Sequence, residues 1–105
     1  MIVLNTSFHA ESAVENEFLS WLREEFPPGL KADGRFEILS VSRLLLSVEE
    51  GLVSYAVRVS APDMDLDTAL EQWQGGQPAI MIADVMKRNA NRVLHFTTPM
   101  EDFDL

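Results

Sequence analysis

Four polar side chains of this sequence could recognise or convert a small molecule: Asn5, Arg43, Arg58 and His95. The two arginines could hold a carboxylate, because a guanidinium presents its donors in a fork that matches two oxygens. The histidine titrates near neutral pH and could serve as an acid or a base. No nucleophile paired with a base is visible beside them. The four residues therefore predict a ligand site, although they do not identify catalytic residues. The alternative is that the four side chains hydrogen-bond across a dimer interface.

Other chemistry is poorly supported by the sequence. Asp63, Asp65 and Asp67 resemble the start of a calcium loop, but Thr68 stands where that loop requires glycine and Gln74 where it requires glutamate. An acidic start of a helix explains the three aspartates better. The chain has 2 histidines and no cysteine, too few ligands for a metal site. We expect no metal and no cofactor.

Composition narrows the class of protein. The 105 residues fit a single domain, 1–105, and 47% of them are hydrophobic, enough for one core. The net charge of −9 argues against nucleic acid, since each phosphate contact needs a cation. No apolar stretch approaches the roughly 20 residues of a membrane span, and the N-terminus lacks the basic segment of a signal peptide. We expect an acidic, cytoplasmic protein that binds neither nucleic acid nor membrane.

The elements that must position these side chains alternate between two hydrophobic periods. Residues 2–8 alternate as a strand, 14–26 repeat as a helix, two alternating runs flank Glu50-Gly51, a second helical stretch follows Asp63, and 92–100 alternate again. This order predicts an α+β fold, the ferredoxin-like β-α-β-β-α-β sandwich, in which two helices cover one face of a four-stranded antiparallel sheet.

The helix ends carry local signals. We expect His9 in the turn before the first helix, which begins near Ser12 with Glu15 completing a capping box. Pro27-Pro28-Gly29 ends that helix and begins a loop. In the second helical region, residues 75–78 (Gly-Gly-Gln-Pro) interrupt the pattern, and the proline suits the first turn of a renewed helix.

The central hairpin allows two registers. With a two-residue turn at Glu50-Gly51, apolar residues oppose one another: Val48 faces Val53, Leu46 faces Tyr55, and Leu44 faces Val57. A three-residue loop would instead pair Ser47 with Val53 and Arg43 with Val57. Because side chains alternate strictly along a strand, the second register sets apolar against polar side chains. We predict the first.

The face of the sheet away from the helices is predicted to be half apolar. It would comprise Val3, Asn5, Ser7, Leu39, Val41, Arg43, Leu45, Leu52, Ser54, Ala56 and Arg58, joined from the last strand by Val93, His95 and Thr97, while Leu94 and Phe96 point to the core. Such a face indicates packing against a second copy across a partly wet cavity. We therefore expect a two-fold homodimer through this open face.

The order of several motifs resembles a known family. They are Leu4-Asn5-Thr6-x-Phe8, Phe18-Leu19-x-Trp21-Leu22, Asp33-Gly34-x-Phe36, residues 53–57 (Val-Ser-Tyr-Ala-Val) and Arg92-Val93-Leu94-x-Phe96-x-Thr98-x-Met100-Glu101. Together they resemble the bacterial domain of unknown function 4286. That family is similar in layout to the dimeric α/β-barrel superfamily, which includes cofactor-free monooxygenases, haem-degrading enzymes and isomerases. Histidines that members often carry in both helical regions are absent here, so no role of theirs is transferred.

Two classes of function stay open at this point. One is a homodimeric ligand-binding or protein-interaction module, favoured because the polar residues are dispersed. The other is a cofactor-independent enzyme of the monooxygenase or isomerase kind that uses the cavity behind the sheet. Fold-level similarity alone cannot choose between them.

Overall fold

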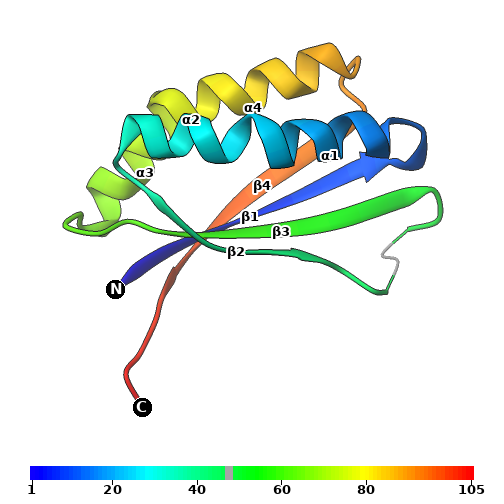
Figure 1. Ribbon diagram of the computed structural model, residues 1–105. Coiled ribbons are helices and arrows are strands. Elements are labelled where there is room, and N and C mark those ends of the chain that lie inside the picture. Colours follow the sequence, from blue (N-terminus) through cyan, green and yellow to red (C-terminus); the bar gives the residue numbers. More distant parts are fainter. Residues whose placement is uncertain (47–48) are drawn as a thin grey trace.

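The computed structural model describes residues 1–46 and 49–105, and it confirms the predicted fold class and order of strands. In this part of the chain β1 (Ile2–Glu11), β2 (Glu37–Arg43), β3 (Leu52–Ser60) and β4 (Val93–Glu101) form one antiparallel sheet in the order β2-β3-β1-β4. Helices cover one face of this sheet and leave the other open (Figure 1). The fold is the α+β, ferredoxin-like sandwich.

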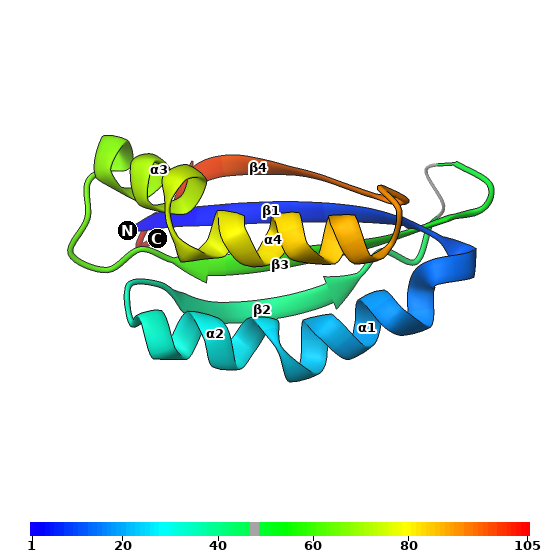
Figure 2. The ribbon, with the colours of Figure 1, turned by 90° about the horizontal axis from the view of Figure 1, so that it is seen from above.

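Each of the two helical regions is divided. The first comprises the 3₁₀ turn η1 (Ser12–Val14), α1 (Glu15–Glu24) and α2 (Phe26–Asp33), and the second comprises α3 (Leu66–Gly75) and α4 (Gln77–Arg88). Seen from above, α1 and α2 run along the β2 edge while α4 lies over the middle of the sheet (Figure 2). The break before Pro78 is confirmed, with the proline in the first turn of α4.

The predicted start and end of the first helix need correction. Ser12 lies in the 3₁₀ turn and its hydroxyl donates to the Gly51 carbonyl at 3.0 Å, so the capping box with Glu15 is wrong. The proline pair does end α1, but it occupies the first turn of α2 and no loop follows. A proline there needs no helical N–H partner and has a suitable φ already. The new helix ends at Gly34, whose φ of 78° favours glycine.

The core lies between the helices and the sheet and is rich in aromatic rings. Phe8 is fully buried, and its ring centroid lies 5.2 Å from that of Phe18 and 5.8 Å from that of Trp21. Trp21 in turn stacks on Phe26 at 4.6 Å. Trp73 packs edge-on against Phe36 below α3. Both tryptophans therefore belong to the core, as their helical spacing predicts.

Both hairpin registers considered from the sequence are wrong. Arg43 opposes Tyr55 and Val41 opposes Val57, and a bulge between Ile38 and Ser40 shifts the pairing further along β2. β2 ends at Arg43, with one more hydrogen bond from the Leu44 N–H to the Ser54 carbonyl at 2.9 Å, and β3 begins only at Leu52. The connection is therefore longer than a two- or three-residue turn. The predicted partners Leu44 and Leu46 lie in that connection and are exposed. The pairs that involve Ser47 and Val48 lie outside the described residues.

The observed strand pairing also reverses the predicted orientation of several residues on the two edge strands, β2 and β4. Side chains directly opposite one another share a face of the sheet. His95 opposes Phe8, a core residue, and the Thr97 hydroxyl lies 2.7 Å from that of Thr6, so β4 turns Val93, His95 and Thr97 toward the helices. Leu94 and Phe96 lie on the open face instead. Val41 and Arg43 likewise face the helix layer, while Leu39 lies in the bulge and Leu45 beyond the strand.

Candidate functional site

The four residues predicted to share a ligand site are divided between the two faces of the sheet. Asn5 and Arg58 oppose each other on β1 and β3 and lie on the open face, as predicted. Arg43 and His95 lie on the helix side, on the two edge strands β2 and β4. The structure therefore does not bring the four side chains together, and three separate regions have to be considered.

The open face near Asn5 and Arg58 is joined to the C-terminal residues. The Arg58 Nη2 atom lies 3.1 Å and 3.2 Å from the two carboxylate oxygens of Asp102. The backbone N–H of Asp102 donates to the Met1 carbonyl at 3.0 Å, and Asn5 donates to the Ser7 hydroxyl at 3.4 Å. The segment after β4 leaves the sheet on this side, as Figure 1 shows. Arg58 is thus engaged by a carboxylate of its own chain.

Further along the open face, His9 lies between Ser54 of β3 and two large apolar side chains of β4. His9, which the sequence suggested for a turn, lies on β1, where its Nδ1 atom is 2.7 Å from the Ser54 hydroxyl. Its ring stacks on that of Phe96 at 5.8 Å. Phe96 is 55% exposed and Leu94 60% exposed. Two large apolar side chains therefore face away from the core next to a histidine that is already hydrogen-bonded.

A pocket of about 510 Å³ lies on the helix side between α1 and β2, here called the α1–β2 pocket. It is lined by Leu19, Leu22, Arg23, Pro27, Val41, Arg43 and Tyr55. At its edge the Tyr55 hydroxyl donates to Glu15 Oε2 at 2.7 Å, and Arg43 Nη2 lies 3.6 Å from the same oxygen. Burial, together with the nearby Glu15 carboxylate, raises the pKa of Tyr55 above its ordinary 10.0. Tyr55 is therefore a neutral donor at physiological pH.

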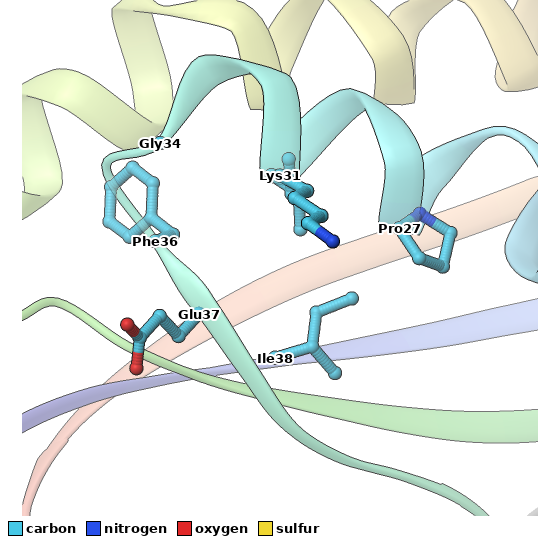
Figure 3. Close-up of a pocket in the computed structure, with 7 residues that line it drawn as sticks. Pro27, Lys31, Gly34, Phe36, Glu37 and Ile38 are labelled. Carbon is cyan, nitrogen blue, oxygen red and sulfur yellow. The ribbon is translucent and has the colours of Figure 1, made fainter.

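A second pocket, the α2–β2 pocket, adjoins the first at Pro27. It measures about 390 Å³ and is lined by Pro27, Leu30, Lys31, Gly34, Phe36, Glu37 and Ile38. In Figure 3 the Lys31 ammonium points into the space between Pro27 and Ile38, whereas the Glu37 carboxylate points away from it. The Lys31 ammonium therefore enters the pocket, whereas the Glu37 carboxylate lies outside it. Sequence reasoning missed the α1–β2 pocket because it placed Val41 and Arg43 in the wrong register, and it missed the α2–β2 pocket because it took the residues of α2 for a loop.

The third region is a pocket of about 220 Å³ beside His95, lined also by Trp73, Gln74, Ala79, Ile82, Phe96 and Thr97. The imidazole lies 6.2 Å from the Phe8 ring, centroid to centroid. Partial burial lowers the pKa of His95 below its ordinary 6.5. His95 is therefore neutral at physiological pH and could accept a proton.

Neither a metal centre nor a membrane span is found in the described part of the chain. Across residues 1–46 and 49–105, no three His, Asp or Glu side chains gather as potential metal ligands. No described helix is long and apolar enough to cross a bilayer. Asp65, from the aspartate run, caps α3 by accepting the Thr68 backbone N–H at 2.8 Å, and this hydrogen bond lowers its pKa.

Comparison with known proteins identifies a family but no activity. Residues 1–103 match the family described as Domain of unknown function (DUF4286), and no curated protein matches. Among solved structures, an ethyl tert-butyl ether d (ethd) family protein from Bacillus halodurans is similar with a TM-score of 0.65 and 12% identity, covering 98% of this chain and 100% of that one. Rv0793 from Mycobacterium tuberculosis has a TM-score of 0.53 at 12% identity, with coverage of 100% and 98%.

Two further neighbours bear on interpretation. A putative antibiotic biosynthesis monooxygenase from Bacillus cereus is similar with a TM-score of 0.50 at 12% identity, covering 99% of this chain and 96% of that one. A de novo designed protein has a TM-score of 0.58 at 11% identity, with coverage of 97% and 98%. Similarity at this level of identity establishes the fold alone. A designed protein among the neighbours illustrates that the fold does not imply a function.

Proposed function

We propose that this chain, which belongs to the family described as Domain of unknown function (DUF4286), is a homodimeric binding domain that pairs through the open face of its sheet. The observation that carries the proposal is the exposure of Leu94 and Phe96, at 60% and 55%, on the face that no helix covers. Burying one such side chain fully is worth about 1.5–3 kcal/mol. Two-fold pairing would bury the same pair from each copy.

The edges of the sheet are less suited to association than its face. β4 contains Pro99, which has no N–H to donate to another strand. β2, the opposite edge, carries the bulge between Ile38 and Ser40, which disrupts regular pairing. Both devices protect an edge strand against extension by another chain. The open face is therefore the better candidate for the homodimer interface.

Charge on the open face is compatible with this pairing. Arg58 lies 3.1 Å from Asp102 of its own chain, so a second copy would not meet an uncompensated guanidinium there. Asn5, directly opposite Arg58, keeps amide groups that could hydrogen-bond to the second copy or to a ligand held between the faces. In this proposal Asn5 and Arg58 line the interface, whereas Arg43 and His95 lie outside it.

The mass of the protein in solution tests the homodimer. Light scattering or sedimentation equilibrium at micromolar concentration should give twice the 11.8 kDa chain mass. The variant carrying Leu94→Arg and Phe96→Arg should be a folded monomer, because its like charges would face one another. Ile80→Arg is the matched control, since Ile80 is 62% exposed but lies on α4. A monomeric native protein, or equal dissociation by the control, would refute the proposal.

The second candidate, a cofactor-independent enzyme of the monooxygenase or isomerase kind, has one favourable observation. His95 is a neutral base beside a pocket. At about 220 Å³, however, that pocket is smaller than the roughly 300–1,000 Å³ typical of small-molecule sites. A thermal-shift survey with haem, flavins and small aromatic acids tests this candidate. It gains support only if a compound is bound and converted, and if His95→Ala abolishes conversion while the melting temperature of the unliganded protein is kept.

A further inference from the structure

We infer that the groove formed by the α1–β2 pocket and the α2–β2 pocket binds a small organic anion with an apolar body, such as a medium-chain carboxylate. The inference deepens the proposed function, on which it rests, by naming a ligand class for the binding domain. The groove lies on the helix side of β2, whereas the proposed homodimer uses the open face. Ligand binding and dimerisation can therefore be measured separately.

The size and shape of the groove suit a small molecule. The two pockets share Pro27 and measure about 510 Å³ and 390 Å³, each within the range of roughly 300–1,000 Å³ found for ligand sites. Their common floor is β2, which contributes Ile38 to one and Val41 to the other. Their roof consists of α1 and α2, which run in line along this edge of the sheet (Figure 2). An elongated ligand could extend through both.

Incomplete coverage of β2 is the main reason to expect an apolar body. Val41 faces the helix layer, opposite the fully buried Val57, yet it is 46% exposed. The helices therefore do not reach far enough to cover this edge of the sheet. Leu19 and Leu22 of α1 form the other apolar wall of the same pocket. A hydrocarbon segment between these walls would remove Val41 from water.

The charges of the groove are unusual for this protein. The chain has only 8 basic residues and a net charge of −9, yet Arg23, Lys31 and Arg43 all line the groove. Among the described residues, Arg23 and Lys31 take part in no ion pair. Three cations gathered in one groove of an acidic protein attract an anion more strongly than scattered ones. Their stems can also pack on the apolar body of a ligand.

The two acidic groups of the groove leave room for an anion. Glu15 is held by the Tyr55 hydroxyl, and its contact with Arg43 is long, at 3.6 Å, with 53% of the Arg43 side chain exposed. Arg43 therefore keeps guanidinium donors for a second carboxylate. Glu37 points away from the space that Lys31 enters (Figure 3). The geometry places the anionic group of the ligand between Arg23 and Arg43, with its chain directed past Pro27.

Binding of octanoate, compared with that of uncharged 1-octanol, tests the inference. Calorimetric titration should detect octanoate, and ¹H–¹⁵N NMR spectra should show shifts at Val41 and Tyr55. Octanol should bind at least about tenfold more weakly, because it lacks the charged group and a hydrogen bond to a charged group raises affinity about tenfold or more. Equal affinity for the two compounds, or NMR shifts confined to the open face, would overturn the inference.

Charge-removing variants complete the test. The variant carrying Arg23→Gln and Arg43→Gln should bind octanoate at least about tenfold more weakly than the native protein. Lys87→Gln is the matched control, because Lys87 is an exposed cation in the last turn of α4 and lines none of these pockets. If the double variant fails to fold, Arg23→Gln alone should still weaken binding, and unchanged affinity would refute the anion site. Loss of octanoate binding with the dimer mass kept would separate this site from the homodimer.

Discussion

Replacing Tyr55 by phenylalanine should destabilise the protein by removing one hydroxyl and little else. Tyr55 is 5% exposed, and its hydroxyl donates to Glu15 Oε2 at 2.7 Å. Its ring packs on Phe18 at 5.6 Å, and phenylalanine preserves this contact. The substitution therefore tests whether the hydrogen bond at the edge of the α1–β2 pocket stabilises the fold.

The expected loss follows from the character of this bond. A hydrogen bond to a charged group contributes about 1.5–3 kcal/mol. The Glu15 side chain is 25% exposed, so water compensates part of the loss and the lower end applies. A decrease of about 1.5 kcal/mol lowers the melting temperature of a domain of this size by about 6–12 °C. Removing the long Arg43–Glu15 contact should cost about 1 kcal/mol or less, because both partners are partly solvated.

Urea unfolding at fixed protein concentration measures the effect, and a double-mutant cycle with Glu15→Ala assigns it to the pair. We expect a coupling free energy of about 1–1.5 kcal/mol between the two positions. A Tyr55→Phe variant as stable as the native protein would refute the reasoning. So would a destabilised variant whose coupling to Glu15 is zero within error, because the loss would then come from packing.

The same pair predicts a pH dependence. Burial and Glu15 raise the pKa of Tyr55 in the folded state above the 10.0 of the unfolded chain. The protonated form is thus favoured by folding, so its contribution is fully present below pH 10 and is lost as the pH rises through the folded value. The stability difference between the native protein and Tyr55→Phe should therefore shrink in alkaline solution. A difference that is constant to high pH would contradict this account.

Three further perturbations have defined outcomes. Gly76→Ala should lower the free energy of unfolding in urea by about 1–3 kcal/mol, because a Cβ there would collide with the backbone carbonyl of Gln72 in α3. Gly75→Ala has open space around it and should be neutral or stabilising. Phe8→Ala should cost about 3–5 kcal/mol because Phe8 is fully buried, and Phe103→Ala, 76% exposed, about 0.5 kcal/mol or less. Burial lowers the pKa of His95 in the folded state, so its contribution to the free energy of unfolding is present above pH 6.5 and is lost as the pH falls through the pKa of the folded state. Between these two pH values, His95→Gln should lose less stability than the native protein.

Most of the fold could be predicted because its signals are periodic and local. The alternation in β1, the stripe of Phe18, Trp21 and Leu22 on α1, and the break before Pro78 each depend on neighbouring residues. Helix boundaries were predicted less well where two interpretations of one motif compete. Pro27-Pro28 ends α1 and begins α2, because proline disrupts the interior of a helix but is favourable in its first turn.

The candidate site could not be predicted because it depends on strand register. The turn signal at Glu50-Gly51 is too weak to determine the register of the hairpin. The leucine-rich stretch before it offered apolar partners for β3 that the fold does not use, since Leu44 and Leu46 are exposed. The bulge at Ile38 and Ser40 has no clear mark in the sequence. Since adjacent side chains point to opposite faces, the wrong hairpin register assigned Val41 and Arg43 to the open face. The pocket they line was hidden by that assignment.

The features most useful for function are those that the fold does not require. A designed protein shares this architecture, so the sheet and its core do not by themselves indicate an activity. Stability alone would favour covering Val41 and removing Leu94 and Phe96 from water, yet all three remain substantially exposed. Arg23, at the same edge as Val41, supplies a cation to an apolar pocket in an acidic chain. These departures from a minimal fold are located on two opposite faces, which is the arrangement expected if one face binds a second copy and the other binds a small anion.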